Sequence, residues 1–174
     1  MKVLLHSCCA PCATYPLHLL RCGGHLVQGV FINPNIYPEG EEAKRWDVYR
    51  DWAGTADLTV VRADVSHREW LDAVSGGLEK PGRCFLCYRF RMRKAAAAAK
   101  AEGFDCFTTT LLISPYQDHD AVIRAMEEAS DAEGVPYLYQ DFRPGYRRSR
   151  EMARGAHLYM QKYCGCEFSL REGL

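Results

Sequence analysis

Short apolar runs alternate along the chain with longer segments in which apolar residues recur at every third or fourth position. The runs predict buried strands, and the spaced segments predict helices. Strands are expected at residues 2–6, 25–32, 58–61, 104–113 and 135–142, and helices at 14–20, 39–55, 67–74, 88–102, 118–132 and 147–162. Parallel strands need crossover connections, so this alternation predicts an α/β fold with three layers and a mostly parallel sheet.

Length and composition fit one such fold. The chain has 174 residues, 48% of them hydrophobic and 25% charged, which is typical of one globular domain. We expect residues 1–174 to form a single α/β domain with a C-terminal cysteine-bearing tail. No apolar run reaches the roughly 18 residues that span a bilayer, and the apolar stretch after Met1 is too short for a signal peptide. These features predict a cytoplasmic protein with no membrane partner.

Nine cysteines set this chain apart from an average domain. An odd number at uneven spacing, without a secretion signal, favours metal binding or redox chemistry over a disulfide framework. Seven of the cysteines fall into three clusters: Cys8, Cys9 and Cys12; Cys84 and Cys87; Cys164 and Cys166. The first cluster directly follows the first predicted strand, and ligands of open α/β sheets bind at the carboxyl ends of the strands.

The two later clusters have features that suit thiolate ligands. Cys84 and Cys87 open a predicted helix, where the helix dipole is expected to lower the pKa of a thiol. Gly165 would let Cys164 and Cys166 converge through a tight turn. Four thiolates suit zinc or an iron–sulfur cluster, and seven exceed the need of a closed zinc site. Cys22 and Cys106 are expected to be small buried hydrophobic residues.

Basic residues gather in two acid-poor runs, whereas the total of 22 Lys and Arg equals the total of 22 Asp and Glu. The runs comprise Arg83, Arg89, Arg91, Arg93, Lys94 and Lys100, and then Arg143, Arg147, Arg148, Arg150 and Arg154. Such runs suit a phosphate backbone, although a solvated helix face is equally consistent with them. Tyr116, Phe142 and Tyr146 could stack on an unpaired base or pack in the core.

Three other sites carry candidate polar groups. Residues 33–38 are rich in Asn and Pro, which predicts a rigid, exposed loop in which Asn33 and Asn35 could make contacts. His119 stands between a predicted strand and a predicted helix, where it could act as an acid or cap the helix. His6 is expected to be structural.

Read together, the motifs resemble the cobalamin-independent epoxyqueuosine reductases, which complete queuosine biosynthesis on transfer RNA. The residues that carry the resemblance span nearly the whole chain: residues 5–12 (LHSCCAPC), 33–36 (NPNI), 83–89 (RCFLCYR), 104–112 (FDCFTTTLL), 114–117 (SPYQ), 141–143 (DFR) and 163–166 (YCGC). The resemblance implies an adenine-nucleotide-hydrolase-like core, a 4Fe-4S cluster and reduction of the epoxide on the modified wobble base to the alkene of queuosine.

The resemblance also implies roles for residues. Cys8, Cys9, Cys84, Cys87, Cys164 and Cys166 become candidate cluster or redox thiols, of which four suffice. It further implies an iron ion beside the cluster that shares cysteines and uses a carboxylate, a place that Cys12 could take here. In that case the second iron could be bound differently or be absent, and the extra thiols could instead serve as a dithiol reservoir. In this hypothesis His119 or Asp141 donates a proton, Tyr116, Gln117 and Tyr146 border the flipped-out base, and Arg143 and the arginines after it hold the phosphates of the anticodon stem-loop.

An electron donor is required but is not identified by the sequence. The main alternative is a non-catalytic RNA-binding module in which Cys84, Cys87, Cys164 and Cys166 hold structural zinc. A nucleotide-dependent enzyme ranks third, because the loop after the first strand has no glycine and its Pro11 lacks an N–H donor for phosphate.

Overall fold

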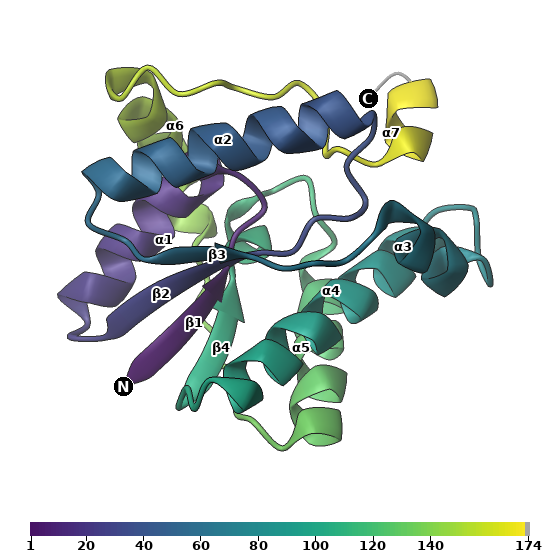
Figure 1. The fold of residues 1–174 in the computed structure, drawn as a ribbon, viewed down its shortest axis with the longest axis horizontal. Coiled ribbons are helices and arrows are strands. Elements are labelled where there is room, and N and C mark those ends of the chain that lie inside the picture. Colours follow the sequence, from purple (N-terminus) through teal and green to yellow (C-terminus); the bar gives the residue numbers. More distant parts are fainter. Residues whose placement is uncertain (173–174) are drawn as a thin grey trace.

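A four-stranded parallel sheet in the order β3-β2-β1-β4 forms the centre of the fold (Figure 1). This computed structural model describes residues 1–172. The strands are β1 (Lys2–His6), β2 (Leu26–Phe31), β3 (Val60–Arg62) and β4 (Cys106–Thr109). His6 is paired with Val30 of β2 and with Thr109 of β4. The carboxyl ends of the adjacent strands β2, β1 and β4 therefore lie at one edge of the sheet.

Helices cover both faces of this sheet. On one face α1 (Ala10–Cys22) packs against α2 (Glu39–Thr55) and α6 (Tyr146–Gly155). On the other, α4 (Gly82–Ala101) packs on β1 and β4 and is flanked by α3 (His67–Val74) and α5 (His119–Glu133). The remaining elements are two short 3-10 helices, η1 (Thr110–Ile113) and η2 (Arg143–Gly145), and the terminal helix α7 (Glu167–Arg171). The predicted three-layer α/β architecture is confirmed.

Small residues allow close packing around the sheet. Ala95, Ala96 and Ala99 of α4 are fully buried, and α4 packs extensively against α5. Gly29 of β2 is equally constrained, because a Cβ there would lie 2.1 Å from the hydroxyl of Tyr49. The Tyr49 hydroxyl instead donates to Ser7 Oγ at 2.8 Å. This contact connects α2 to the edge where β1 ends.

Two predicted elements differ from those in the structure. The strand expected at residues 135–142 is reduced to a single bridge between Phe107 and Tyr137, because Pro136 has no N–H to donate to a ladder. The helix expected at 147–162 ends at Gly155; the chain then takes a positive φ of 53° at His157 and continues as a loop. The cysteine-bearing tail thus follows a loop and ends in α7.

Other boundaries shift less. The strand predicted at 104–113 spans only β4, because residues 110–113 turn into η1. The helix predicted from residue 14 begins at Ala10. The helices predicted at 39–55 and 67–74 have the bounds of α2 and α3.

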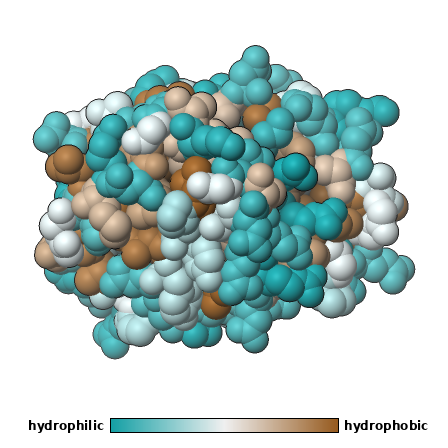
Figure 2. Space-filling model, turned by 90° about the horizontal axis from the view of Figure 1, so that it is seen from below, coloured by the Kyte–Doolittle hydropathy of each residue, from teal (hydrophilic) through white to brown (hydrophobic). Residues whose placement is uncertain are grey.

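The surface mixes residue types. In Figure 2 hydrophobic residues lie among hydrophilic ones over the face seen from below. Within the described part of the chain, the helices are too short or too polar to cross a membrane. Cys106 is buried as predicted, whereas Cys22 is exposed, because it ends α1 at the surface; its prediction as a core residue is wrong.

Candidate metal centre

The site is built on the carboxyl edge of the sheet. The buried His6 imidazole joins neighbouring strands, with Nδ1 2.8 Å from Thr109 Oγ1 and Nε2 3.1 Å from the carbonyl oxygen of Ile32. Burial, assisted by the charge of Arg91, lowers the pKa of His6 to about 3. His6 is therefore neutral near pH 7 and structural, as the sequence predicts.

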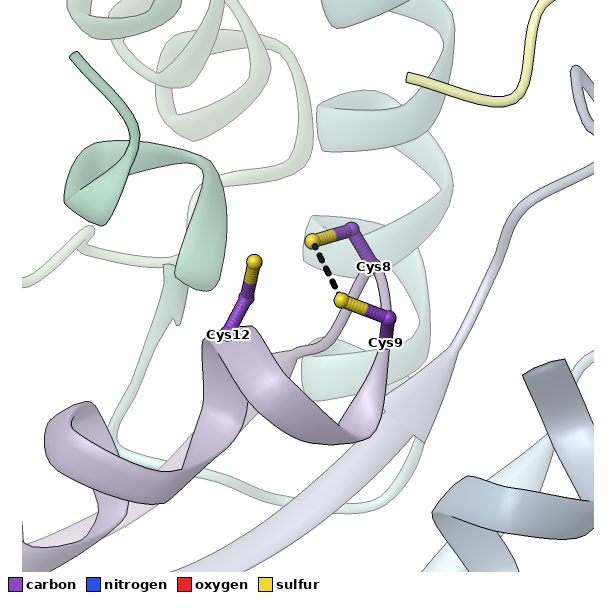
Figure 3. Close-up of side chains that lie close together, drawn as sticks. All are labelled: Cys8, Cys9 and Cys12. Atoms are coloured by element: carbon purple, nitrogen blue, oxygen red, sulfur yellow. Dashed lines mark hydrogen bonds between the residues drawn. The ribbon is translucent and has the colours of Figure 1, made fainter. Parts of the chain in front are cut away.

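Cys8, Cys9 and Cys12 form the first thiol group, which we call the α1 thiol group. Their three Sγ atoms lie within 4.8 Å of one another, and those of Cys8 and Cys9 are 3.8 Å apart (Figure 3). Cys9 is the extended residue before α1, and Cys12 lies in the first turn of that helix. A short segment at a strand-to-helix junction thus brings three sulfurs together.

Polar side chains from distant segments contact this group. The Thr110 hydroxyl accepts from the backbone N–H of Cys8 at 3.0 Å and donates to its Sγ at 3.3 Å. Gln161 Nε2 donates to Cys9 Sγ at 2.7 Å. Gln161 lies in the loop after α6, for which neither spacing nor composition of the sequence suggests a contact.

The pKa values of the three thiols in the α1 thiol group shift in different directions. Hydrogen bonds from Cys12 and Cys9 hold the pKa of Cys8 well below its ordinary value. Burial raises the pKa of Cys9 to about 12, and the pKa of Cys12 is raised mainly by its hydrogen bond to Cys8. These contacts therefore favour the thiolate form of Cys8 over the thiolate forms of Cys9 and Cys12.

Cys84, Cys87, Cys164 and Cys166 form the second group, which we call the α4 thiol group. Cys84 and Cys87 lie in the first turns of α4. Cys87 and Cys166 belong to one small buried cluster with Trp70 and Val74. The charge of Cys164 acts on both Cys84 and Cys87, so the middle and the end of the chain meet here.

The segment that carries Cys164 and Cys166 is held by backbone contacts. Cys166 forms an antiparallel bridge with Ile36, and the N–H of Tyr37 donates to the Gly165 carbonyl at 2.8 Å. Gly165 has φ +115°, and a Cβ there would lie 2.8 Å from Ile36 Cγ1. Arg45 donates to the carbonyl oxygen of Cys164 at 3.1 Å. The tight turn expected at Gly165 is present.

Burial governs the thiols on α4. Desolvation raises the pKa values of Cys84 and Cys87, so the expectation that the helix dipole lowers them is wrong for the free protein. A hydrogen bond from Cys166 lowers the pKa of Cys164 to about 5, whereas the same contact raises the pKa of Cys166. In the α4 thiol group, as in the α1 thiol group, one thiol has a lowered pKa and the others have raised pKa values.

Two aromatic rings contact each other near the start of α6. Tyr116 is 82% exposed, and its ring centroid lies 6.0 Å from that of Tyr146 in an edge-on arrangement. Tyr146 begins α6, which packs against α1, the helix that carries Cys12. Gln117 accepts a hydrogen bond from the Tyr88 hydroxyl at 2.8 Å. Tyr116 and Tyr146 thus form an exposed ring platform.

The predicted acid–base residues form a separate polar group. Arg143 donates to Asp141 through its guanidinium at 2.7 Å and its backbone N–H at 3.0 Å, which lowers the pKa of Asp141 to about 2. Asp141 is thus a carboxylate at neutral pH. His119 Nε2 lies 3.2 Å from the Tyr139 hydroxyl, and the charge of His119 also acts on Asp141.

Other expected contacts are less accessible than the sequence suggests. Asn33, Asn35 and Ile36 are buried, so the prediction of an exposed loop is wrong at these positions. Asn33 Nδ2 donates to the Ser7 carbonyl at 2.9 Å, which closes the loop onto β1. Arg83 and Arg91 are also buried, so these two residues of the first basic run are not available to a phosphate at the surface. The substrate contacts proposed for Asn33 and Asn35 stay predictions.

The donor set fits a thiophilic metal centre. Cys8, Cys9 and Cys12 stand where β1 ends, and sulfur ligands select zinc, copper(I) or iron–sulfur clusters over hard cations. Cys9 is buried and Cys8 and Cys12 are half-buried, and the spacing of their three sulfurs can hold a metal ion. Fold and site together define an α/β protein with a sulfur-rich ligand site at the carboxyl edge of its sheet.

Comparison with known proteins identifies the family within that class. Residues 3–172 match the family described as Epoxyqueuosine reductase QueH. The chain is 33% identical over 169 residues to Epoxyqueuosine reductase QueH of Dehalococcoides mccartyi, covering 97% of this chain and 92% of the relative. It is 34% identical to the protein of that name from Histophilus somni, over 98% of this chain and 73% of the relative. The chain belongs to the epoxyqueuosine reductase QueH family.

A solved structure supports the fold. The chain is similar to the crystal structure described as a predicted subunit of a tRNA methyltransferase from Methanocaldococcus jannaschii, with a TM-score of 0.59, 9% identity, and coverage of 87% of this chain and 74% of that one. At this identity the likeness concerns the α/β architecture alone.

Proposed function

We propose that this protein is an epoxyqueuosine reductase, which removes the epoxide oxygen of epoxyqueuosine at the wobble position of transfer RNA and leaves queuosine. The reaction consumes two electrons and two protons and releases the oxygen as water, while the carbon–carbon bond becomes a double bond. The observation that carries the proposal is the family match over residues 3–172, on a chain whose seven clustered thiols suit a redox metal centre. The proposed setting is the cytoplasm, with a separate protein or small reductant as electron donor.

The two thiol groups are the proposed ligands of an iron–sulfur centre. Four thiolates hold a 4Fe-4S cluster, and seven leave further thiols for an adjacent iron, with Cys12 in the place of a carboxylate ligand. Such a centre supplies electrons one at a time and, through an open iron site, a Lewis acid for the oxygen that leaves. The remaining roles fall to the protein's own side chains.

Positioning of the modified base is assigned to the ring platform. Tyr116 offers an exposed face beside Tyr146, at the start of α6, which packs against α1, and an unpaired base gains about 1–3 kcal/mol by stacking on an aromatic ring. We assign a base stacked there to the side of the helix that carries Cys12. Gln117, held by the Tyr88 hydroxyl, is placed to contact an edge of the base.

Proton delivery is assigned to His119. Asp141, whose pKa is lowered to about 2, carries no proton near pH 7, so of the two acids expected from the sequence His119 is the better donor. Asp141 instead orients Arg143 through paired hydrogen bonds. Arg143, with the exposed Arg147 and Arg148 of α6, is proposed to hold phosphates of the anticodon stem-loop.

The test is a nucleoside assay under anaerobic conditions. Iron-reconstituted protein is incubated with transfer RNA that contains epoxyqueuosine and with dithionite, and the digested nucleosides are analysed by mass spectrometry. Queuosine is expected. Absence of queuosine with an intact iron centre would reject the proposed activity.

A matched pair of variants makes the assay specific to the site. Tyr116→Ala removes the exposed ring and is expected to raise KM for the transfer RNA at least about 5-fold, because a stacking contact is lost. Tyr116→Phe keeps the aromatic ring and removes only its hydroxyl, so it should leave KM within about twofold.

A further inference from the structure

Three arginines of this protein are buried, and two of them have carboxylate partners. Arg45, Arg83 and Arg91 are each 3–4% exposed. Arg45 pairs with Glu41 at 2.7 Å and Arg83 with Glu172 at 2.8 Å. Among residues 1–172, no carboxylate lies within ion-pair distance of Arg91.

The hydrogen-bond partners of Arg91 carry no charge. Its Nε donates to the carbonyl oxygen of Ile32 at 3.2 Å, and a terminal nitrogen donates to Asn33 Oδ1. These contacts fix the guanidinium under the carboxyl edge of the sheet, but neither neutralises it. A buried charge without a counter-charge is unfavourable, so an anion beside Arg91 would stabilise the fold.

Cysteine thiolates can supply that anion. Arg91 stands one helical turn after Cys87 and two turns after Cys84 on the same face of α4. Asn33, which accepts from Arg91, donates in turn to the carbonyl oxygen of Ser7, the residue before Cys8. The contacts of Arg91 therefore join the helix that carries Cys84 and Cys87 to the segment that carries Cys8.

We propose that Arg91 is the buried counter-charge of the sulfur centre, a positioning residue that neutralises ligands from both thiol groups and raises the reduction potential of the metal they hold. The inference rests on the proposed iron–sulfur centre but not on its substrate. A fixed positive charge in a buried site favours the more negative, reduced state of a cluster, because it stabilises the added electron.

The test compares Arg91→Gln with Arg91→Lys in the reconstituted holoprotein, without transfer RNA. Glutamine removes the charge, and lysine retains it without the guanidinium geometry. In a dithionite redox titration followed by electron paramagnetic resonance, Arg91→Gln is expected to lower the ratio of reduced to oxidised centre at fixed potential at least tenfold, equal to about 59 mV for one electron. Arg91→Lys should recover most of that shift.

Arg93→Gln is the matched control. Arg93 lies on the same helix, is 69% exposed and faces Glu133, so its loss should leave the potential unchanged. An Arg91→Gln centre with wild-type potential would overturn the proposal. So would an Arg91→Lys protein that behaves like Arg91→Gln, since the guanidinium fork rather than its charge would then matter.

Unfolding of the metal-free protein tests whether Arg91 acts through its charge or through its hydrogen bonds to Ile32 and Asn33. Burial raises the pKa of Cys87 in the metal-free protein, whereas a bound metal would hold that sulfur as a thiolate. Arg91→Gln should therefore destabilise the metal-free protein less than the loaded protein in urea unfolding. An equal loss in both forms, or failure of the metal-free variant to fold, would make Arg91 a clamp for Ile32 and Asn33 and would overturn the proposal. Each outcome is independent of turnover on transfer RNA.

Discussion

The two thiol groups reach the same edge of the sheet by different routes. The α1 thiol group is local: Cys8, Cys9 and Cys12 lie at one strand-to-helix junction, and their sulfurs lie within 4.8 Å of one another. The α4 thiol group joins the first turns of α4 to residues 164–166, which a loop carries past α2 to the end of the chain (Figure 1). One group follows from chain geometry and the other from long-range packing.

The two thiol groups therefore depend on different contacts and should be disturbed by different substitutions. The α1 thiol group depends on the junction itself and on contacts such as that with Thr110. The α4 thiol group depends on Arg45, on the bridge at Ile36 and on the turn at Gly165. Substitutions outside the cysteines should therefore affect the α4 thiol group more than the α1 thiol group.

Loss of a thiol should give the largest effect. Cys9→Ser and Cys87→Ser each remove one sulfur from one group, and both are expected to reduce queuosine formation by about 100-fold or more, because metal affinity falls with a lost ligand. Turnover and bound iron are measured together. Cys22→Ser, which alters an exposed thiol, should stay within about twofold. If only one of the two site variants lost activity, the other group would be structural.

Gly165→Ala should weaken the α4 thiol group selectively. Alanine at φ +115° is strained, and its Cβ would press on Ile36 Cγ1 at 2.8 Å, so we expect a loss of about 1–3 kcal/mol in unfolding free energy and less bound iron. Urea unfolding and iron analysis test this. Gly155→Ala, where a Cβ meets open space, is the control; an equal effect of both changes would refute the constraint.

Thr110→Val should act on the α1 thiol group to a smaller extent. Valine retains the shape of threonine but removes the hydroxyl that contacts the Cys8 N–H and Sγ, which is expected to cost about 1–2 kcal/mol of unfolding free energy. Thr110→Ser keeps the hydroxyl and should lose less. The same urea unfolding experiment compares them, and a valine variant as stable as wild type would contradict a role for this contact.

Asp141→Asn should have the smallest effect, since it touches neither thiol group. The pKa of Asp141 falls from 3.8 to about 2 beside Arg143, so its ion pair stabilises the protein above about pH 4 and is lost as the pH falls through 2. The partners are partly exposed, which limits the gain to under about 1 kcal/mol. Unfolding at pH 6 and pH 2 should show the wild-type advantage only at pH 6.

Much of the architecture is predictable because its signals are local. The spacing of apolar residues defines α2 and α3 to their end residues, and the CCAPC run places three thiols at the end of β1. Gly165 is expected to turn, and it does. These features depend on neighbours within a few positions.

The remaining features depend on tertiary packing, which a local pattern does not contain. Residues 135–142 have strand composition, but Pro136 leaves them with one bridge. Dipole arguments predict acidic thiols on α4, yet burial raises their pKa values. Arg91 belongs to a basic run that suits phosphate, although its spacing of four residues from Cys87 was a signal that it shares the thiol face. Gln161 has no such signal.

Iron and acid-labile sulfide analysis of the anaerobically purified protein tests the central claim most directly, namely that thiols from both groups hold one redox centre. We expect brown protein with at least four irons and about four sulfides per chain, as a 4Fe-4S cluster requires, and loss of that content in both Cys9→Ser and Cys87→Ser. Colourless protein with a single zinc and no sulfide would contradict the account.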